Sequence, residues 1–259
     1  MPNPIIAKGQ VEVINTGASK PIIVECFNNK KYVLKYLGNR QSDKILINEL
    51  VCCRLAKQLG ILVPEVNIIY IPEELIEIEP ILQKLKIPSG LHFGSMYDKD
   101  TSSFTGENSL KNVKNKEVIP RIIAFDYWVG NDDRTGNLGN LLIGTSKNGN
   151  NIITIDYGSA FNGPDWTKED LIYTDIHIMG TDGAVYSCLF GEIKDIGSFN
   201  SICNDIESLG IRDINKCFND IPQEWGFNEY YKELMCKFLY DRKDKLRDTL
   251  AYILRNKLK

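Results

Sequence analysis

Histidine is scarce in this sequence, and its scarcity narrows the chemistry that the chain can carry. The 259 residues include two histidines, His92 and His177. A histidine-rich zinc site is therefore a poor explanation of the sequence, because such sites take several imidazole ligands. A Ser-His-Asp triad is also poorly supported, although one histidine would suffice for it in principle.

Cysteine is present but follows no recognisable pattern. The seven cysteines are odd in number and scattered, and the adjacent Cys52 and Cys53 can hardly bridge each other or form a CxxC zinc pair. The sequence therefore predicts reduced, mostly buried thiols rather than a disulfide framework.

An excess of positive charge and a long apolar run are both missing. With 31 Lys and Arg against 34 Asp and Glu, the formal net charge is −3, so no broad cationic surface for nucleic acid is expected. No apolar run reaches about 18 residues, the length that spans a bilayer. The opening MPNPIIAKGQ lacks the charged and apolar regions of a signal peptide. We expect a cytoplasmic protein without a nucleic-acid or membrane partner.

What is present is a globular composition, 43% hydrophobic and 25% charged, with strand patterns in the first half. The runs PIIVECF and KYVLKYL flank Asn28-Asn29, which is typical of a hairpin. Apolar residues at helical spacing predict a helix over 43–59 that ends at Gly60. The run ILVPEVNIIYI predicts another strand, and we expect IEPILQKL, residues 78–85, to be its antiparallel companion.

The later part of the chain changes character. Residues 89–118 are rich in Gly, Ser, Asn and Lys and lack periodicity, so they are interpreted as a linker or flap. A helix is expected from Pro120, followed by the short strands NLLI and NIITID and then mainly by helices. The sequence thus predicts an α+β chain of two lobes. They are a small antiparallel β lobe with one helix over 1–88 and a larger, mainly helical lobe over 119–259.

The stretch VGNDDRTGNLGNLLI, residues 129–143, concentrates polar side chains directly after an apolar run. Asn, Asp and Gly are typical of turns, so a surface turn is one interpretation. The other is a magnesium and phosphate site, because Asp133, Asn140 and Asp156 offer the hard oxygen ligands that Mg²⁺ prefers. Asn140 precedes one short strand and Asp156 ends the next, so two neighbouring strands could aim both side chains into one cleft.

Lys35 lies in the predicted strand KYVLKYL between apolar neighbours. A half-buried lysine needs an anionic partner, and Glu49 on the following helix is one candidate. An ordinary lysine on the wet face of a hairpin is the alternative. Two other nucleotide or metal motifs are absent: no GxxxxGK[ST] follows a strand, and NDDRTGNLGNLLI lacks the alternating ligands and terminal Glu of an EF-hand.

Several ordered motifs together resemble the HipA-like kinases, a bacterial branch of the kinase fold. NTGASKPIIVE and KKYVLKYLG are similar to the family's phosphate loop and lysine strand, and INELVCCRLAKQLGILVPEV is similar to the helix and strand that follow. LHFGS resembles the segment before the linker. FDYWVGNDDRTGNLGNLLI resembles the catalytic loop, and IDYGSAF the metal-binding motif. The likeness runs from about Gly9 to Phe161 and implies a two-lobed kinase-like fold.

The resemblance implies a role for each motif residue in ATP-dependent and Mg²⁺-dependent phosphoryl transfer, which depends mainly on positioning and charge neutralisation. Asp133 would orient or deprotonate the attacking hydroxyl, and Asn140 and Asp156 would hold Mg²⁺. Lys35, steadied by Glu49, would contact the ATP phosphates. The following residues would form the phosphate loop: Thr16, Gly17, Ala18 and Ser19. The implied acceptor is a hydroxyl, with a protein Ser or Thr expected, and an operon-encoded regulatory protein is an implied partner.

Some alternatives stay open at this stage. Asp132 competes with Asp133, although the "DR" pair and the spacing to NLL favour Asp133, and Asn137 competes with Asn140 as the amide ligand. Arg134 could pair with a nearby acid or bridge to a phosphate. His92 is interpreted as a loop histidine, and Trp128 and Trp166 as packing residues. A catalytically silent kinase-like module that binds nucleotide or a partner protein is the alternative function.

Overall fold

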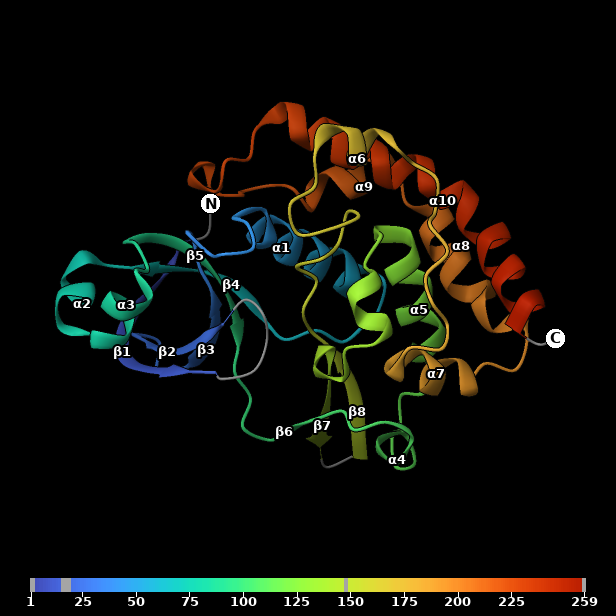
Figure 1. The fold of residues 1–259 in the computed structure, drawn as a ribbon, viewed down its shortest axis with the longest axis horizontal. Coiled ribbons are helices and arrows are strands. Elements are labelled where there is room, and N and C mark those ends of the chain that lie inside the picture. Colours follow the sequence, from blue (N-terminus) through green and yellow to red (C-terminus); the bar gives the residue numbers. More distant parts are fainter. Residues whose placement is uncertain (1–2, 15–19, 147–148, 258–259) are drawn as a thin grey trace.

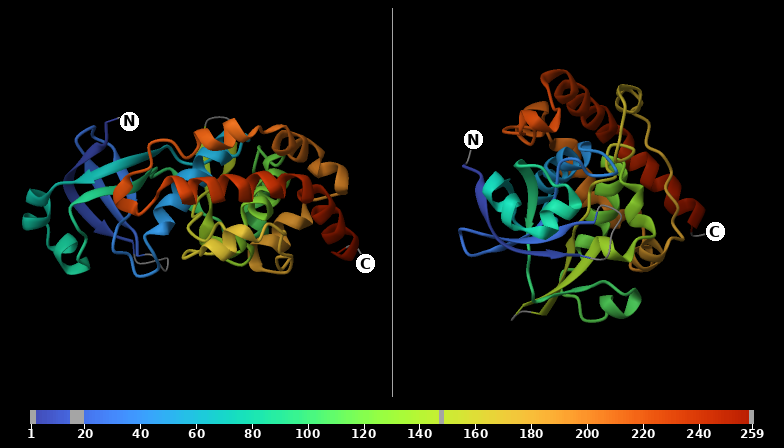
Figure 2. Two further views of the ribbon diagram at one scale, coloured as in Figure 1. Left: turned by 90° about the horizontal axis from the view of Figure 1, so that it is seen from above. Right: turned by 60° about the vertical axis from the view of Figure 1, so that its left-hand side comes forward.

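The computed structural model describes residues 3–14, 20–146 and 149–257, and these form two lobes of unequal size. Figure 1 shows a β barrel at one end of the molecule and a larger, mainly helical lobe at the other. The two views of Figure 2 show the same separation, with the last helix running along the larger lobe. The predicted α+β, two-lobed fold is therefore confirmed.

The small lobe is a closed barrel with strand order β1-β2-β3-β5-β4. Neighbouring strands of the barrel pair antiparallel, with one exception: β1 and β4, whose pairing closes the barrel, are parallel. The hairpin of β2 and β3 turns at Asn28 and Asn29 as predicted, with Asn29 at a positive φ of 58°. In this register Lys35, the last residue of β3, lies opposite Phe93 of β5. The strands are β1 (Ile5–Val13), β2 (Ile22–Cys26), β3 (Lys31–Lys35), β4 (Val66–Ile71) and β5 (Gly90–Met96).

The prediction of a strand over 78–85 is wrong, because this segment belongs to two short helices, α2 (Glu73–Ile78) and α3 (Pro80–Leu85). Proline cannot donate to a strand ladder, but it fits the first turn of a helix, and Pro80 opens α3 in this way. The helices bury Leu75 and Leu82 in the barrel core. The antiparallel partner of β4 is instead β5.

Residues 89–118, interpreted from the sequence as a linker or flap, hold regular structure. They contain β5, the strand β6 (Thr101–Ser103) and the helix α4 (Glu107–Leu110). β5 is a central strand, paired with both β3 and β4, so its small and polar residues are packed rather than exposed. At Gly94, for example, a Cβ atom would lie 2.4 Å from Ile69, a distance that no side chain could tolerate.

The larger lobe combines a three-stranded sheet, in the order β6-β7-β8, with helices that pack around α5. No helix in the described residues is both long and apolar enough to cross a membrane. The elements of this lobe are α5 (Val118–Val129), β7 (Leu141–Ser146), β8 (Gly149–Thr154), α6 (Lys168–Ile172), α7 (Ala184–Gly191), α8 (Asn200–Ser208), α9 (Ile211–Lys216) and α10 (Glu229–Lys257).

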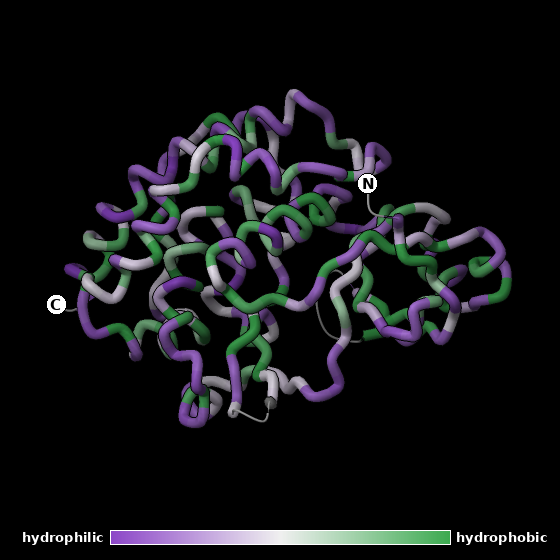
Figure 3. Tube along the Cα trace, turned by 180° about the vertical axis from the view of Figure 1, so that it is seen from behind, coloured by the Kyte–Doolittle hydropathy of each residue, from purple (hydrophilic) through white to green (hydrophobic). Residues whose placement is uncertain are grey.

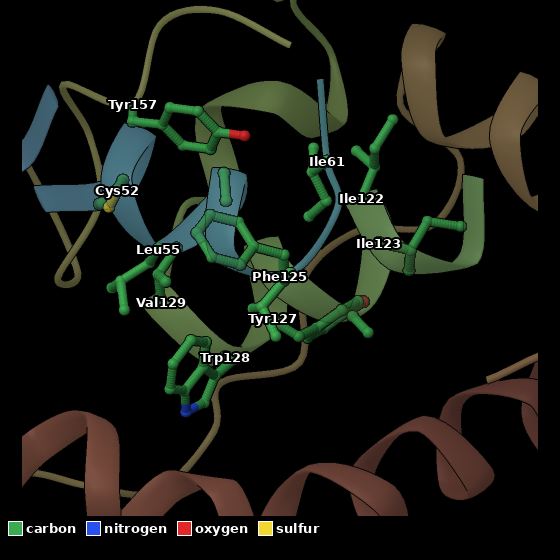
Figure 4. Close-up of a cluster of buried hydrophobic side chains, with 14 of the residues drawn as sticks. Cys52, Leu55, Ile61, Ile122, Ile123, Phe125, Tyr127, Trp128, Val129 and Tyr157 are labelled. Atoms are coloured by element: carbon green, nitrogen blue, oxygen red, sulfur yellow. The ribbon is translucent and has the colours of Figure 1, made fainter. Parts of the chain in front are cut away.

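Helix α1 (Lys44–Gln58) follows the barrel strand β3 in sequence but packs into the core of the larger lobe. Figure 4 shows Cys52 and Leu55 of α1 beside Phe125 and Val129 of α5 in one cluster of buried side chains. The barrel has a separate core of its own. Figure 3 shows apolar residues concentrated in the interior of the larger lobe, whereas its outer helices alternate in polarity. β3 and α1 therefore belong to different cores, and Phe93 of β5 joins the larger one.

Candidate active site

The polar stretch begins where α5 ends. Gly130 caps α5 in the left-handed conformation, with φ of 70°, and a Cβ atom there would lie 2.5 Å from the side chain of Asn162. The 3-10 helix η1 (Asp132–Thr135) follows, and a second one, η2 (Leu138–Asn140), leads into β7. The stretch is thus a compact loop between α5 and the sheet, rather than a simple turn.

Within this loop, Asp133 and Asn140 lie together. The Asn140 amide nitrogen donates to the Asp133 carboxylate at 2.6 Å, and Asn140 is buried while Asp133 is exposed. Asn137 lies farther away, with its amide nitrogen 3.4 Å from Asp133, and its oxygen caps η2 by accepting from the Gly139 N–H. Asp132 is exposed. Of the two asparagines, Asn140 therefore lies closer to Asp133 than Asn137 does.

Asp156 and Lys35 meet between the lobes although they are 121 positions apart in the sequence. The Lys35 ammonium donates to Asp156 at 2.5 Å and to Glu49 of α1 at 2.5 Å. Asp156 follows β8 and adopts φ of 60°, a conformation that non-glycine residues rarely take and that clusters at functional sites. Lys35 is 8% exposed, so it does not lie on the wet face of the hairpin.

The electrostatics of this triad follow from one ammonium shared by two carboxylates. Burial lowers the pKa of Lys35, but Asp156 and Glu49 more than offset this effect and raise the pKa above its usual value. Burial raises the pKa of Glu49. Burial also acts to raise the pKa of Asp156, but the Lys35 ammonium outweighs it and holds that pKa below the usual range. The three side chains carry a formal charge of −1, which suits the approach of a cation.

Arg134 resolves one open alternative, because it pairs with an acid inside the protein. Its guanidinium is fully buried and donates to Asp126 of α5 at 2.8 Å. It also donates to the backbone carbonyls of Asn140 and Ile155, the second at 2.8 Å. Since Ile155 precedes Asp156, this one side chain links the ends of both strands that carry the proposed metal ligands.

The remaining site predictions have mixed outcomes. Thr16, Gly17, Ala18 and Ser19 lie outside the described residues. His92 is a buried residue of strand β5 rather than a loop histidine, and it accepts a hydrogen bond from the Leu37 N–H at 3.1 Å.

Sequence reasoning missed two buried polar residues that support the site, Asp126 and Asn48. Asp126 gave a signal, because an acid within the apolar run IIAFDYWV needs a partner. Asn48 gave none, since its partners lie more than a hundred positions away.

The donor set around Asp156 is suited to a magnesium ion that keeps several waters and phosphate ligands. No group of three His, Cys, Asp or Glu side chains in the described chain forms a ready metal cage. The residues that could hold such an ion are the predicted ones, Asp156 through its carboxylate and Asn140 through its amide. Because the Asn140 nitrogen donates to Asp133, its oxygen is the atom available to a cation.

Comparison with known proteins agrees with this architecture. The protein-family model described as HipA-like kinase matches residues 9–255. The crystal structure of the Helicobacter pylori proinflammatory kinase CtkA is similar, with a TM-score of 0.59 at 14% identity over 96% of this chain and 97% of that one. The Golgi casein kinase with Mn/ADP bound has a TM-score of 0.55 at 14% identity, covering 95% of this chain and 74% of that one. No curated protein matches the chain.

Proposed function

The chain belongs to the HipA-like kinase family, and from this premise we propose that it transfers the γ-phosphate of ATP to a hydroxyl group in a Mg²⁺-dependent reaction. The proposed acceptor is a Ser or Thr of a protein. The observation that carries the proposal is the meeting of Lys35 from the barrel with Asp156 from the larger lobe, at 2.5 Å. A cytoplasmic location stays a prediction from the sequence composition, and an operon-encoded regulatory partner stays a prediction of the family resemblance.

Asp133 is the proposed residue that receives the acceptor. Its side chain is exposed, so a hydroxyl of another molecule can reach it. One of its carboxylate oxygens is occupied by the Asn140 amide, which leaves the other to accept a hydrogen bond from the hydroxyl and take its proton. The hydrogen bond from Asn140 also fixes the orientation of this carboxylate, and orientation is a large part of the barrier in phosphoryl transfer.

Lys35 and Asp156 are the proposed contacts to the nucleotide and its metal. Bound Mg²⁺ would neutralise charge on the phosphates, with Asp156 and Asn140 holding it. The buried carboxylate of Glu49 faces the Lys35 ammonium and stabilises its positive charge. When Lys35 contacts a phosphate, Glu49 keeps its stem in place while the bond to Asp156 is given up. The Golgi casein kinase structure, a similar fold, holds Mn and ADP, which supports the proposal that this fold binds a nucleotide and a metal.

The test is phosphoryl transfer by the purified chain from radiolabelled ATP with Mg²⁺, to itself or to proteins of a cell extract. We expect Asp133→Ala and Asp156→Ala each to lower the rate at least about a hundredfold, the scale of losing a charge-stabilising group. Asp213→Ala is the matched control, because Asp213 lies in an exposed ion pair on α9.

The outcomes separate the two candidate functions. Transfer at the wild-type rate by both site variants would contradict the assignment of the site and point to a contaminating kinase. ATP binding that needs no metal, with no transfer by the wild-type chain, would support the silent module instead.

A further inference from the structure

Asn48 is a buried polar residue that neither the sequence motifs nor the proposed mechanism uses. It lies on α1 directly before Glu49 and is 0% exposed. Its amide nitrogen donates to the carbonyls of Gly158 and Ala160 at 2.8 and 3.0 Å. A longer contact reaches the carbonyl of Gly163 at 3.4 Å. The side chain thus binds the backbone just after Asp156.

The orientation of the Asn48 amide is fixed from its other side by Trp166. The indole N–H of Trp166 donates to the Asn48 oxygen at 2.8 Å. An indole can only donate and a backbone carbonyl can only accept, so the partners admit one orientation of the amide. Trp166 is itself held, because Lys44 donates to its carbonyl at 2.7 Å and lies 4.9 Å from its ring centre. Trp166 is therefore more than the packing residue that the sequence suggested.

The segment that Asn48 holds also touches the ion triad. A Cβ atom on Gly158 would lie 3.4 Å from the Asp156 carboxylate, 3.5 Å from the Lys35 ammonium and 3.6 Å from Glu49. The same turn is held by the Glu49 carboxylate, which accepts from the Tyr157 N–H at 3.0 Å. Two consecutive residues of α1 therefore bind the donor and acceptor groups of one turn, and that turn carries Asp156.

We propose that Asn48, oriented by Trp166, is a positioning residue that sets the place of Asp156 for metal binding by fixing the turn at Gly158 to α1. This inference rests on the proposed function, since it takes Asp156 as the metal ligand. Without the amide, the Gly158 and Ala160 carbonyls lose the donor that ties them to α1, although the Gly163 N–H still donates to the Ala160 carbonyl at 3.3 Å. The strained backbone at Asp156 then has less to hold it. Groups that orient a metal ligand commonly change metal affinity by about 10-fold to 100-fold when they are removed.

The test measures ATP binding by calorimetry with and without Mg²⁺, using the full chain, so that it does not depend on turnover. We expect Mg²⁺ to strengthen ATP binding to the wild type. Asn48→Ala should lose about tenfold of that strengthening while its affinity for metal-free ATP stays within about twofold. Trp166→Phe keeps an aromatic ring but removes the indole N–H, so it should act in the same direction by about threefold.

Asn115→Ala is the matched control, because Asn115 also binds backbone groups on both sides, the N–H and C=O of Ile152, but does so within strand β8 rather than at the turn after Asp156. It should keep the full effect of Mg²⁺. Folded Asn48→Ala and Trp166→Phe variants with the wild-type response would overturn the inference alone. If Asn48→Ala does not fold, an unchanged response in Trp166→Phe overturns it. A wild-type chain that binds ATP without any Mg²⁺ effect would overturn the proposed function, and the inference with it.

Discussion

The two lobes contribute to the candidate site in unequal ways. Among the described site residues, the barrel supplies Lys35, whereas the larger lobe supplies Asp133, Asn140 and Asp156. Glu49 belongs with the larger lobe as well, because α1 packs into its core. The acidic half of the site is therefore built on one lobe, and the lysine comes from the other. The site is complete only when the barrel is held against the larger lobe.

The two halves also differ in how they are fixed. In the larger lobe, the fully buried ion pair of Arg134 and Asp126 holds the strand ends that carry Asn140 and Asp156. On the barrel side, Lys35 is placed by its position at the end of β3, opposite Phe93. The strand ends that carry Asn140 and Asp156 are thus tied together within the larger lobe, while the role of Lys35 depends on the contact between the lobes.

The largest expected effect comes from removing the contribution of the barrel. Lys35→Met keeps most of the apolar stem but leaves Glu49 and Asp156 without their cation, so we expect phosphoryl transfer to fall at least about a hundredfold. Lys31→Met is the matched control on the same strand, because Lys31 forms an exposed ion pair with Glu12. The measurement is the rate of phosphoryl transfer from radiolabelled ATP by the wild type and both variants. An active Lys35→Met variant would contradict the idea that the barrel supplies a needed charge.

The two lobes also differ in how well the sequence predicts their structure. Asp133, Asn140 and Asp156 fall within two short motifs whose spacing is local, so the sequence could predict them as a group. The error at 78–85 arose because apolar residues in a short segment suit a strand or a helix equally well, and Pro80 was the overlooked signal. The placement of α1 in the larger core, and the contact of Asn48 with Gly158, depend on distant parts of the chain that local patterns do not encode.

A second prediction concerns the pH dependence of stability, which we expect to depend on the buried His92 of the barrel. Burial lowers the pKa of His92 to about 4, from an ordinary value near 6.5. The unfolded chain therefore binds a proton that the folded chain refuses, and stability falls as pH drops from about 6.5 towards 4. By pH 5 this loss should reach about 2 kcal/mol relative to pH 7.5. Urea unfolding of the wild type and of His92→Gln, which cannot take up that proton, measures the difference.

The control for this pH effect is His177→Gln, since His177 is exposed in the larger lobe. It should unfold like the wild type at both pH values. Parallel losses of stability in the wild type and in His92→Gln would show that His92 does not act as a neutral, buried link between β5 and the Leu37 N–H. Groups other than His92 would then account for the acid sensitivity of the fold.

The smallest expected effect tests the contact that holds the lobes together at β5. The 3-10 helix η4 (Gln223–Trp225) of the larger lobe reaches the barrel, where the Trp225 indole N–H donates to the Leu91 carbonyl at 2.8 Å. Glu224 accepts from the Leu91 N–H at 2.5 Å. Trp225→Phe removes the first bond and should lower the free energy of unfolding by about 1 kcal/mol. If the barrel must be held for Lys35 to act, the KM for ATP should also rise.

Trp128→Phe is the control that separates the loss of stability in Trp225→Phe from the rise in its KM for ATP. Trp128 is buried in the larger lobe, and its indole N–H likewise donates to a carbonyl, that of Leu239, at 2.9 Å. Its loss should lower stability by a similar amount, because the chemistry of the lost bond is the same, but it should leave the KM for ATP unchanged. A KM that rises in Trp225→Phe and not in Trp128→Phe would mean that the contact between lobes, rather than stability in general, sets nucleotide binding. Equal KM values in both variants would mean that the ion triad holds the barrel in place without help from η4.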